Sequence, residues 1–161
     1  MPALPTVAFA GIGLMGLPMC RRLIAAGYSL RVWNRSLDKC RALEEMGAQV
    51  VSVPAQLAEG ADIVMLCLAD TAAVREVVFG PSGVASAAKP GQLLLDFSSV
   101  EPAATREMAA ELERLSGMRW VDAPVSGGVP GAEAGTLAIM AGGRGEDVDI
   151  LRPLLAHLGQ R

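Results

Sequence analysis

Three glycines near the start of the sequence have the spacing needed to hold a diphosphate. Gly11, Gly13 and Gly16 follow an apolar run, residues 7–10, in the pattern G-x-G-x-x-G, and a helical pattern starts directly after them. In such a strand–turn–helix setting the first glycine permits the tight turn. The second lets a pyrophosphate approach the backbone, and the third lets the helix pack close to the strand. The start of the helix offers unpaired N–H groups and a partial positive charge. We therefore predict a dinucleotide site formed by Gly11, Ile12, Gly13, Leu14, Met15 and Gly16.

The residues after the second predicted strand indicate which dinucleotide is bound. An acidic residue that bonds the ribose of NAD is expected about twenty residues past the glycines. Asn34, Arg35 and Ser36 occupy that place, and Asp38 comes only later. A guanidinium with polar neighbours binds a 2′-phosphate through charge-assisted hydrogen bonds, whereas a carboxylate would repel it. The sequence thus favours NADP(H) over NAD(H), with Asn34, Arg35 and Ser36 as ligands. The alternative is a solvated arginine beside a serine that only caps a helix.

Two further polar turns follow predicted strands. Ser126, Gly127 and Gly128 come just after the sixth strand, where successive free N–H groups and a hydroxyl form an anion-binding concavity. The alternative is a flexible glycine turn. Ser98 and Ser99 follow the fifth strand, and for them the alternative is a cap for the next helix.

Strands alternate with helices along the whole chain, which predicts one α/β domain over residues 1–161. It is a Rossmann-type doubly wound fold, with a mostly parallel sheet and helices on both faces. The carboxyl ends of parallel strands share one edge, so the polar turns meet there. The predicted strands are 7–10, 30–33, 49–53, 62–68, 92–96 and 118–122, with an extra strand at 136–141. The predicted helices are 17–26, 36–47, 54–59, 71–79, 101–115 and 146–158.

Composition excludes several classes of function. The chain has 161 residues, 52% hydrophobic and 19% charged, which is typical of a globular domain with a sizeable core. The net charge is −3 without a basic block, so we expect no nucleic-acid or membrane partner. The apolar runs are too short to span a membrane, and no signal peptide is evident. The three cysteines form no C-x-x-C pair, so we predict no metal site, and we expect a cytoplasmic protein.

Four segments carry a resemblance to a known family: residues 11–19, 33–36, 96–102 and 122–128, the last being the most specific. With them, essentially the whole chain resembles the N-terminal domain of the β-hydroxyacid dehydrogenases. That family includes 3-hydroxyisobutyrate dehydrogenase, tartronate semialdehyde reductase and the glyoxylate/succinic semialdehyde reductases. The Asn-Arg-Ser step is similar to the NADPH-using glyoxylate reductase branch.

The resemblance implies roles for residues beyond the glycines. The backbone of Leu68 and Ala69 would pass beside the ribose and nicotinamide, although the family often has proline at position 69. Ser99 corresponds to a usual threonine near the nicotinamide and the substrate, and both residues carry a hydroxyl. The turn formed by Ser126, Gly127 and Gly128 would hold the carboxylate of a small substrate.

The resemblance also implies a catalytic lysine, which lies beyond Arg161 at the start of an all-helical second domain. The only lysines here are Lys39 and Lys89, and we expect neither at the carboxyl edge of the sheet. We therefore predict no catalytic residue in this chain, and a structural role for His157. The expected function is the cofactor-binding half of an NADP(H)-dependent oxidoreductase, with little activity alone and a homo-oligomer at full length.

The reaction implied is the interconversion of a small 3-hydroxy acid and its semialdehyde or keto acid, such as glyoxylate or succinic semialdehyde reduction or 3-hydroxyisobutyrate oxidation. Two alternatives stay open. One is a non-catalytic nucleotide-binding module, which the missing lysine supports. The other is an imine reductase, since those enzymes share the glycine pattern and the Trp-Asn-Arg step.

Overall fold

The computed structural model describes residues 3–160, and its centre is a parallel sheet of six strands in the order β3-β2-β1-β4-β5-β6. Every strand pair in this sheet is parallel, which confirms the predicted doubly wound class. Strand β1 lies between β2 and β4, where the order reverses. The strands are β1 (Val7–Ala10), β2 (Leu30–Trp33), β3 (Gln49–Val50), β4 (Ile63–Leu66), β5 (Leu93–Asp96) and β6 (Arg119–Asp122).

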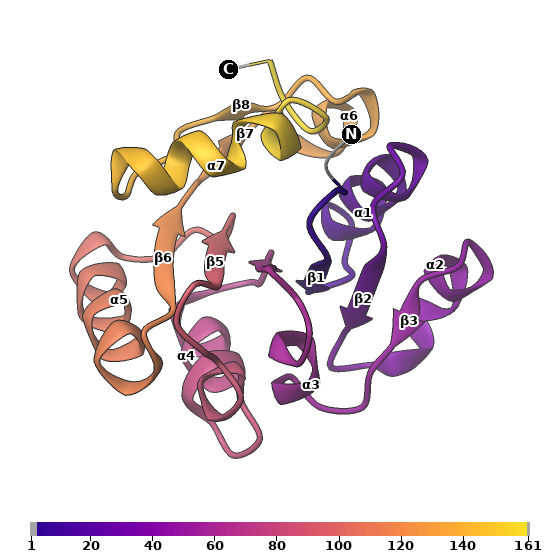
Figure 1. The fold of residues 1–161 in the computed structure, drawn as a ribbon. Coiled ribbons are helices and arrows are strands. Elements are labelled where there is room, and N and C mark those ends of the chain that lie inside the picture. Colours follow the sequence, from indigo (N-terminus) through magenta and orange to yellow (C-terminus); the bar gives the residue numbers. More distant parts are fainter. Residues whose placement is uncertain (1–2, 161) are drawn as a thin grey trace.

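Helices cover both faces of this sheet (Figure 1). Side chains of a strand point alternately to opposite faces, so each central strand contributes side chains to two hydrophobic cores. In β1, Val7 and Phe9 pack with α1 and α7, whereas Ala8 and Ala10 pack with α3, α4 and α5. The helices are α1 (Gly16–Ala25), α2 (Arg41–Glu45), α3 (Ala55–Ala58), α4 (Thr71–Phe79), α5 (Pro102–Ser116), α6 (Gly128–Ala134) and α7 (Gly145–Leu155), with 3-10 turns η1 (Leu37–Cys40) and η2 (Val84–Ser86).

The segment after β6 differs most from the prediction. The extra strand exists only as β8 (Ala138–Ile139), which pairs antiparallel with β7 (Val125–Ser126) outside the main sheet. Helix α6 between them was not predicted, because its glycines and proline have low helix propensity. Tertiary packing overrides that propensity: a Cβ added at Gly131 would lie 3.1 Å from the Leu137 side chain.

The connection between β2 and β3 is also more irregular than predicted. The single helix predicted over 36–47 is split into η1 and α2, and the strand predicted over 49–53 is only two residues long. Ser36 does occupy the N-cap position of η1, but its side chain makes no capping hydrogen bond. Strand β3 is a sheet edge, bonded to β2 alone, so little holds it in an extended ladder.

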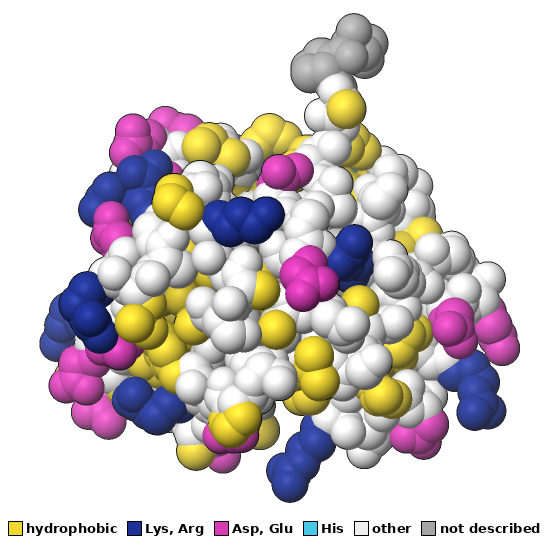
Figure 2. All heavy atoms as spheres, turned by 60° about the horizontal axis from the view of Figure 1, so that its bottom comes forward, with side chains coloured by type: hydrophobic (Ala, Val, Ile, Leu, Met, Phe, Trp, Pro, Cys, Tyr) yellow, Lys and Arg dark blue, Asp and Glu magenta, His cyan; other side chains and the backbone are white. Residues whose placement is uncertain are grey.

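Within residues 3–160, no helix is long and apolar enough to cross a membrane. The same residues contain no cluster of three or more His, Cys, Asp or Glu that could hold a metal ion. Figure 2 shows that Lys and Arg side chains on one face of the molecule are interspersed with Asp and Glu.

Candidate cofactor-binding site

The glycine turn between β1 and α1 has the geometry that its spacing predicts. Gly11 has a φ of +103°, and a Cβ there would collide with the carbonyl oxygen of Cys67. A Cβ at Gly16 would collide with the carbonyl oxygen of Gly11, so α1 packs directly on the turn. At Gly13 a Cβ would meet no heavy atom within 4 Å. Two of the glycines are therefore required by the fold, and the third faces open space.

This open side of the turn carries hydrogen-bond donors. The backbone N–H groups of Gly13, Leu14 and Met15 donate to no acceptor among residues 3–160. The first turn of α1 contains no acidic residue that would compete for them. Free N–H groups at the start of a helix are complementary to a phosphate oxygen. The turn thus fits the diphosphate of a dinucleotide.

Asn34, at the end of β2, braces the turn from the side. Its Oδ1 accepts the N–H of buried Ile12 at 2.8 Å, and its Nδ2 donates to the carbonyl of Ser36 at 3.0 Å. This side chain therefore fixes the glycine turn relative to the end of β2. Arg35 and Ser36 are exposed, and Arg35 takes part in none of the ion pairs formed within residues 3–160. Arg35 is thus available to a ligand.

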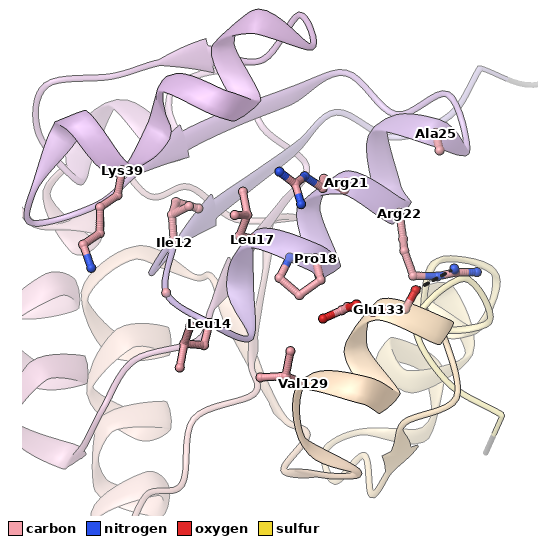
Figure 3. Close-up of a pocket in the computed structure, with 11 residues that line it drawn as sticks. Ile12, Leu14, Leu17, Pro18, Arg21, Arg22, Ala25, Lys39, Val129 and Glu133 are labelled. Atoms are coloured by element: carbon pink, nitrogen blue, oxygen red, sulfur yellow. Dashed lines mark hydrogen bonds between the residues drawn. The ribbon is translucent and has the colours of Figure 1, made fainter.

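An open cavity of about 800 Å³ runs from the glycine turn along the outer face of α1 (Figure 3). Ile12, Gly13 and Leu14 line one end, and Val129 and Glu133 of α6 line the opposite wall. Arg22 closes the far side by donating to the carbonyl oxygens of Glu133 at 3.2 Å and His157 at 2.7 Å. Apart from the turn residues, the predicted ligands do not line this cavity.

The expectation for Lys39 was wrong. This lysine lies in η1 and lines the same cavity as Ile12 and Gly13, so it does reach the cofactor edge of the sheet. Lys39 follows Arg35 by four residues, but Arg35 lies before the 3-10 turn, which begins at Leu37, so helical spacing does not relate the two side chains. The sequence contains no local signal for this position of Lys39. Lys89 precedes β5 and lies at the amino edge, as expected.

The side chain of Ser98, for which a helix cap was the alternative role, joins the turns after β4 and β5. Oγ of Ser98 accepts the N–H of Leu68 at 2.8 Å, and the N–H of Ser98 donates to Oδ1 of Asp96 at 2.9 Å. Neither Ser98 nor Ser99 caps α5, whose N-cap is Glu101. Ser99 and Ala69 are exposed beside this link.

Titratable groups gather at the ends of these strands. Burial raises the pKa of Asp96 to about 6, partly offset by its hydrogen bonds from Ser98. Burial, together with the nearby charge of Asp96, raises the pKa of Cys67 to about 11. Burial also raises the pKa of Asp122, which is paired with Asp96 across the sheet. The ends of β4, β5 and β6 therefore carry titratable groups that are at least partly buried.

Ser126, Gly127 and Gly128 form an ordered turn between β7 and α6. Gly127 and Gly128 have φ values of +133° and +60°, which only glycine adopts readily, and Gly127 is the N-cap of α6. The carbonyl of Gly127 accepts the N–H of Gly131 at 3.1 Å. All three turn residues are exposed. The turn is therefore built into the start of a helix.

His157 lies in the turn after α7, and its ring packs edge-on against Tyr28 with centroids 5.8 Å apart. Its carbonyl is one of the acceptors for Arg22. Both contacts are structural.

A glycine turn with free donors at the switch point of a doubly wound sheet defines a dinucleotide-binding domain. Comparison with known proteins agrees: the family model for the NAD-binding domain of 6-phosphogluconate dehydrogenase matches residues 6–161. The chain belongs to this family. It is a pyridine-nucleotide-binding domain similar to those of 3-hydroxyisobutyrate dehydrogenases.

Curated relatives share the whole chain but extend well beyond it. A probable 3-hydroxyisobutyrate dehydrogenase-like 3, mitochondrial, from Arabidopsis thaliana is 41% identical, covering 98% of this chain and 49% of its own length. The human mitochondrial 3-hydroxyisobutyrate dehydrogenase is 39% identical, covering 95% of this chain and 45% of its own length. The chain therefore spans about half the length of the curated relatives it matches.

Solved structures agree with the fold. A Mycobacterium tuberculosis 3-hydroxyisobutyrate dehydrogenase with L-serine has a TM-score of 0.90 at 34% identity, over 98% of this chain and 53% of that one. Psf3 in complex with NADP+ and 2-OPP has a TM-score of 0.90 at 33% identity, over 96% of this chain and 54% of that one. An imine reductase from Pseudomonas sp. has a TM-score of 0.88 at 22% identity, over 97% of this chain and 53% of that one. At this identity the similarity shows the fold alone.

Proposed function

We propose that this chain binds NADP(H) in preference to NAD(H), as the cofactor domain of an oxidoreductase that interconverts a small 3-hydroxy acid and its semialdehyde or keto acid. The observation that carries the cofactor preference is the end of β2. An exposed arginine without an ion-pair partner among residues 3–160 stands where an NAD-specific carboxylate is expected. Lys39 supplies a second cation, which lines the cavity beside Gly13 and Leu14.

Each part of the site receives one part of the ligand in this proposal. The free N–H groups of residues 13–15 hold the diphosphate, and Arg35, Ser36 and Lys39 hold the 2′-phosphate. Because the sheet order reverses at β1, the nicotinamide half lies on the other side, toward the turns after β4 and β5. Those turns contain Leu68, Ala69 and Ser99. The bound cofactor supplies or accepts a hydride.

The substrate carboxylate is assigned to the turn of Ser126, Gly127 and Gly128. Its exposed backbone and hydroxyl lie at the start of α6, which suits an anion. The proton donor or acceptor of the reaction is assigned to a lysine outside residues 1–161, in the part of the relatives that this chain does not match. We also propose a helical second domain there and a homo-oligomeric full-length protein.

Names of similar proteins support this assignment. The relatives described above are named 3-hydroxyisobutyrate dehydrogenases, and one structure at 33% identity contains NADP+. The name of the Arabidopsis relative carries the word mitochondrial, so a cytoplasmic location stays a prediction from the sequence.

Calorimetric titration of the chain with NADPH and with NADH tests the cofactor preference. We expect NADPH to bind at least ten-fold more tightly, because hydrogen bonds to a charged group contribute about 1.5–3 kcal/mol. Replacing Arg35 or Lys39 with alanine should weaken NADPH about ten-fold and leave NADH nearly unchanged. Arg75→Ala, on α4, is the matched control and should change neither affinity. Tighter binding of NADH by the wild-type chain would refute the preference.

The reaction class is tested on a longer protein that contains these residues. We expect NADPH-dependent reduction of glyoxylate or succinic semialdehyde, or oxidation of 3-hydroxyisobutyrate. Reduction of a cyclic imine with glyoxylate untouched would instead favour an imine reductase. Cofactor binding without turnover of any of these compounds would favour a non-catalytic nucleotide-binding module.

A further inference from the structure

Asp96 ends β5 as a carboxylate that the fold itself does not fully use. Its side chain has no exposed surface, and its Oδ2 has no hydrogen-bond partner among residues 3–160. Burying a charge without complete pairing destabilises a fold, and a neutral residue of similar size would avoid that cost. The raised pKa of this carboxyl reflects the same cost. Asp96 is therefore better explained by what it positions than by stability.

The other carboxylate oxygen is part of a short chain of hydrogen bonds. Oδ1 of Asp96 accepts the backbone N–H of Ser98 at 2.9 Å. Oγ of Ser98 accepts the N–H of Leu68 at 2.8 Å. The bond to Asp96 thus fixes the backbone of Ser98, the residue whose Oγ reaches Leu68. At neutral pH the charge on Asp96 strengthens its bond to the Ser98 N–H, so Ser98 is held more firmly for the bond to Leu68.

Leu68 depends on this bond because it lies just past the end of a strand. The N–H of Cys67 still bonds to the β1 carbonyl of Ala10 at 2.9 Å, the last such bond between β4 and β1. The next N–H, that of Leu68, has Ser98 in place of a strand partner. Ser98 thus connects the turn after β4 to the turn after β5, and Asp96 holds Ser98 in place.

We propose that Asp96 is a positioning residue that acts through Ser98 to hold the backbone of Leu68 and the adjacent Ser99 in place for the nicotinamide half of the cofactor. The inference rests on the proposed function, which assigns these two turns to that half. The adenosine half lies on the other side of β1, beside Arg35 and Lys39, and does not depend on this chain of bonds.

Two ligands distinguish the nicotinamide half of the site from the adenosine half. NADPH occupies both halves, whereas 2′,5′-ADP lacks the nicotinamide. We expect Ser98→Ala to weaken NADPH at least five-fold and Asp96→Asn to weaken it about three-fold. Neither variant should change the affinity for 2′,5′-ADP by more than two-fold. The Asp96→Asn/Ser98→Ala double variant should bind NADPH like Ser98→Ala, since Asp96 acts only through Ser98. Amide exchange at Leu68, measured by NMR without ligand, should accelerate at least ten-fold in Ser98→Ala and about three-fold in Asp96→Asn, which keeps the Oδ1 acceptor but not the charge.

Ser116→Ala is the matched control. Ser116 also accepts a backbone N–H, from Met118 at 3.1 Å, and donates to a carbonyl, that of Leu112, but it lies at the far end of α5. Ser116→Ala should leave the affinities for NADPH and 2′,5′-ADP and the amide exchange rate at Leu68 unchanged.

Several outcomes would overturn the inference. One is a double variant whose loss of NADPH affinity equals the sum of the losses in the two single variants. Another is an equal loss of affinity for NADPH and for 2′,5′-ADP. A third is unchanged NADPH affinity in Ser98→Ala. A fourth is a wild-type chain that binds NADPH no more tightly than 2′,5′-ADP. A wild-type chain that binds neither ligand would refute the proposed function, on which the inference depends.

Discussion

Replacing Asp96 with asparagine should make the protein more stable at neutral pH. Burial is the largest cause of the raised pKa of Asp96, about 6 in the folded state against an ordinary value of 3.8. This difference between the two pKa values corresponds to about 3 kcal/mol of unfavourable free energy for the charged form. Asparagine keeps the shape and the Oδ1 acceptor for the N–H of Ser98 but carries no charge. Asp96 therefore lowers stability wherever its carboxyl is ionised in the fold.

The sign of the pH dependence follows from proton binding. Between about pH 4 and pH 6 the folded state binds more protons at Asp96 than the unfolded state, so stability falls as pH rises through this window. Below the window the carboxyl is neutral in both states and resembles asparagine. The free energy of unfolding of Asp96→Asn should exceed that of the wild type only slightly near pH 4, and this difference should grow by about 2–3 kcal/mol by pH 7.

Urea unfolding of both proteins, followed by circular dichroism from pH 4 to pH 7.5, measures this difference. The titratable groups nearest Asp96 are Asp122 on β6 and Cys67 just after β4, and both are present in the wild type and in Asp96→Asn. The pKa of Cys67, about 11, lies above this pH range. Asp122→Asn is the matched control: this carboxyl is only partly buried, so its difference should have the same sign and be smaller. A difference that stays constant with pH, or that favours the wild type increasingly above pH 6, would refute the reasoning.

Three further substitutions test the glycine turn. Gly16→Ala forces a Cβ against the Gly11 carbonyl and should cost at least about 2 kcal/mol of stability in urea unfolding, together with cofactor binding. Gly13→Ala meets no protein atom and should stay within about 1 kcal/mol of wild type, yet weaken NADPH at least ten-fold in calorimetry; retained affinity would contradict the diphosphate site. Asn34→Ala leaves the buried N–H of Ile12 without its acceptor and should cost about 1–3 kcal/mol in the same unfolding assay; an unchanged midpoint would exclude a bracing role.

The parts of this molecule that the sequence predicts well are those encoded by neighbouring residues. The apolar run of β1 and the spacing of Gly11 and Gly16 specify a strand, a tight turn and a closely packed helix within ten residues of chain. Backbone sterics alone require these two glycines, since a Cβ at either would collide with a carbonyl oxygen. Parallel pairing follows equally directly from alternating strands and helices.

Where prediction failed, packing contacts outside the local hydrophobic pattern decided the structure. Helix α6 contradicts its own propensity because Gly131 packs against Leu137 from the following strand segment. Lys39 was expected away from the site because one regular helix was predicted over 36–47, whereas this lysine lies in the 3-10 turn η1 and lines the cavity beside Gly13. Local patterns do not encode either packing arrangement.

The hydrogen bonds that shape the candidate site join residues far apart in the sequence. Asn34 bonds to a residue 22 positions earlier, and Ser98 to one 30 positions earlier. In both cases a side chain that follows one strand accepts a hydrogen bond from a backbone N–H in the turn after the neighbouring strand. The sheet order determines these pairs, so each polar residue has a role only once β1 lies between β2 and β4, and β4 beside β5. Asp96 extends this argument, because its charge destabilises the fold while it orients Ser98. A carboxylate at that cost is expected where the position of a backbone group affects ligand binding more than it affects folding.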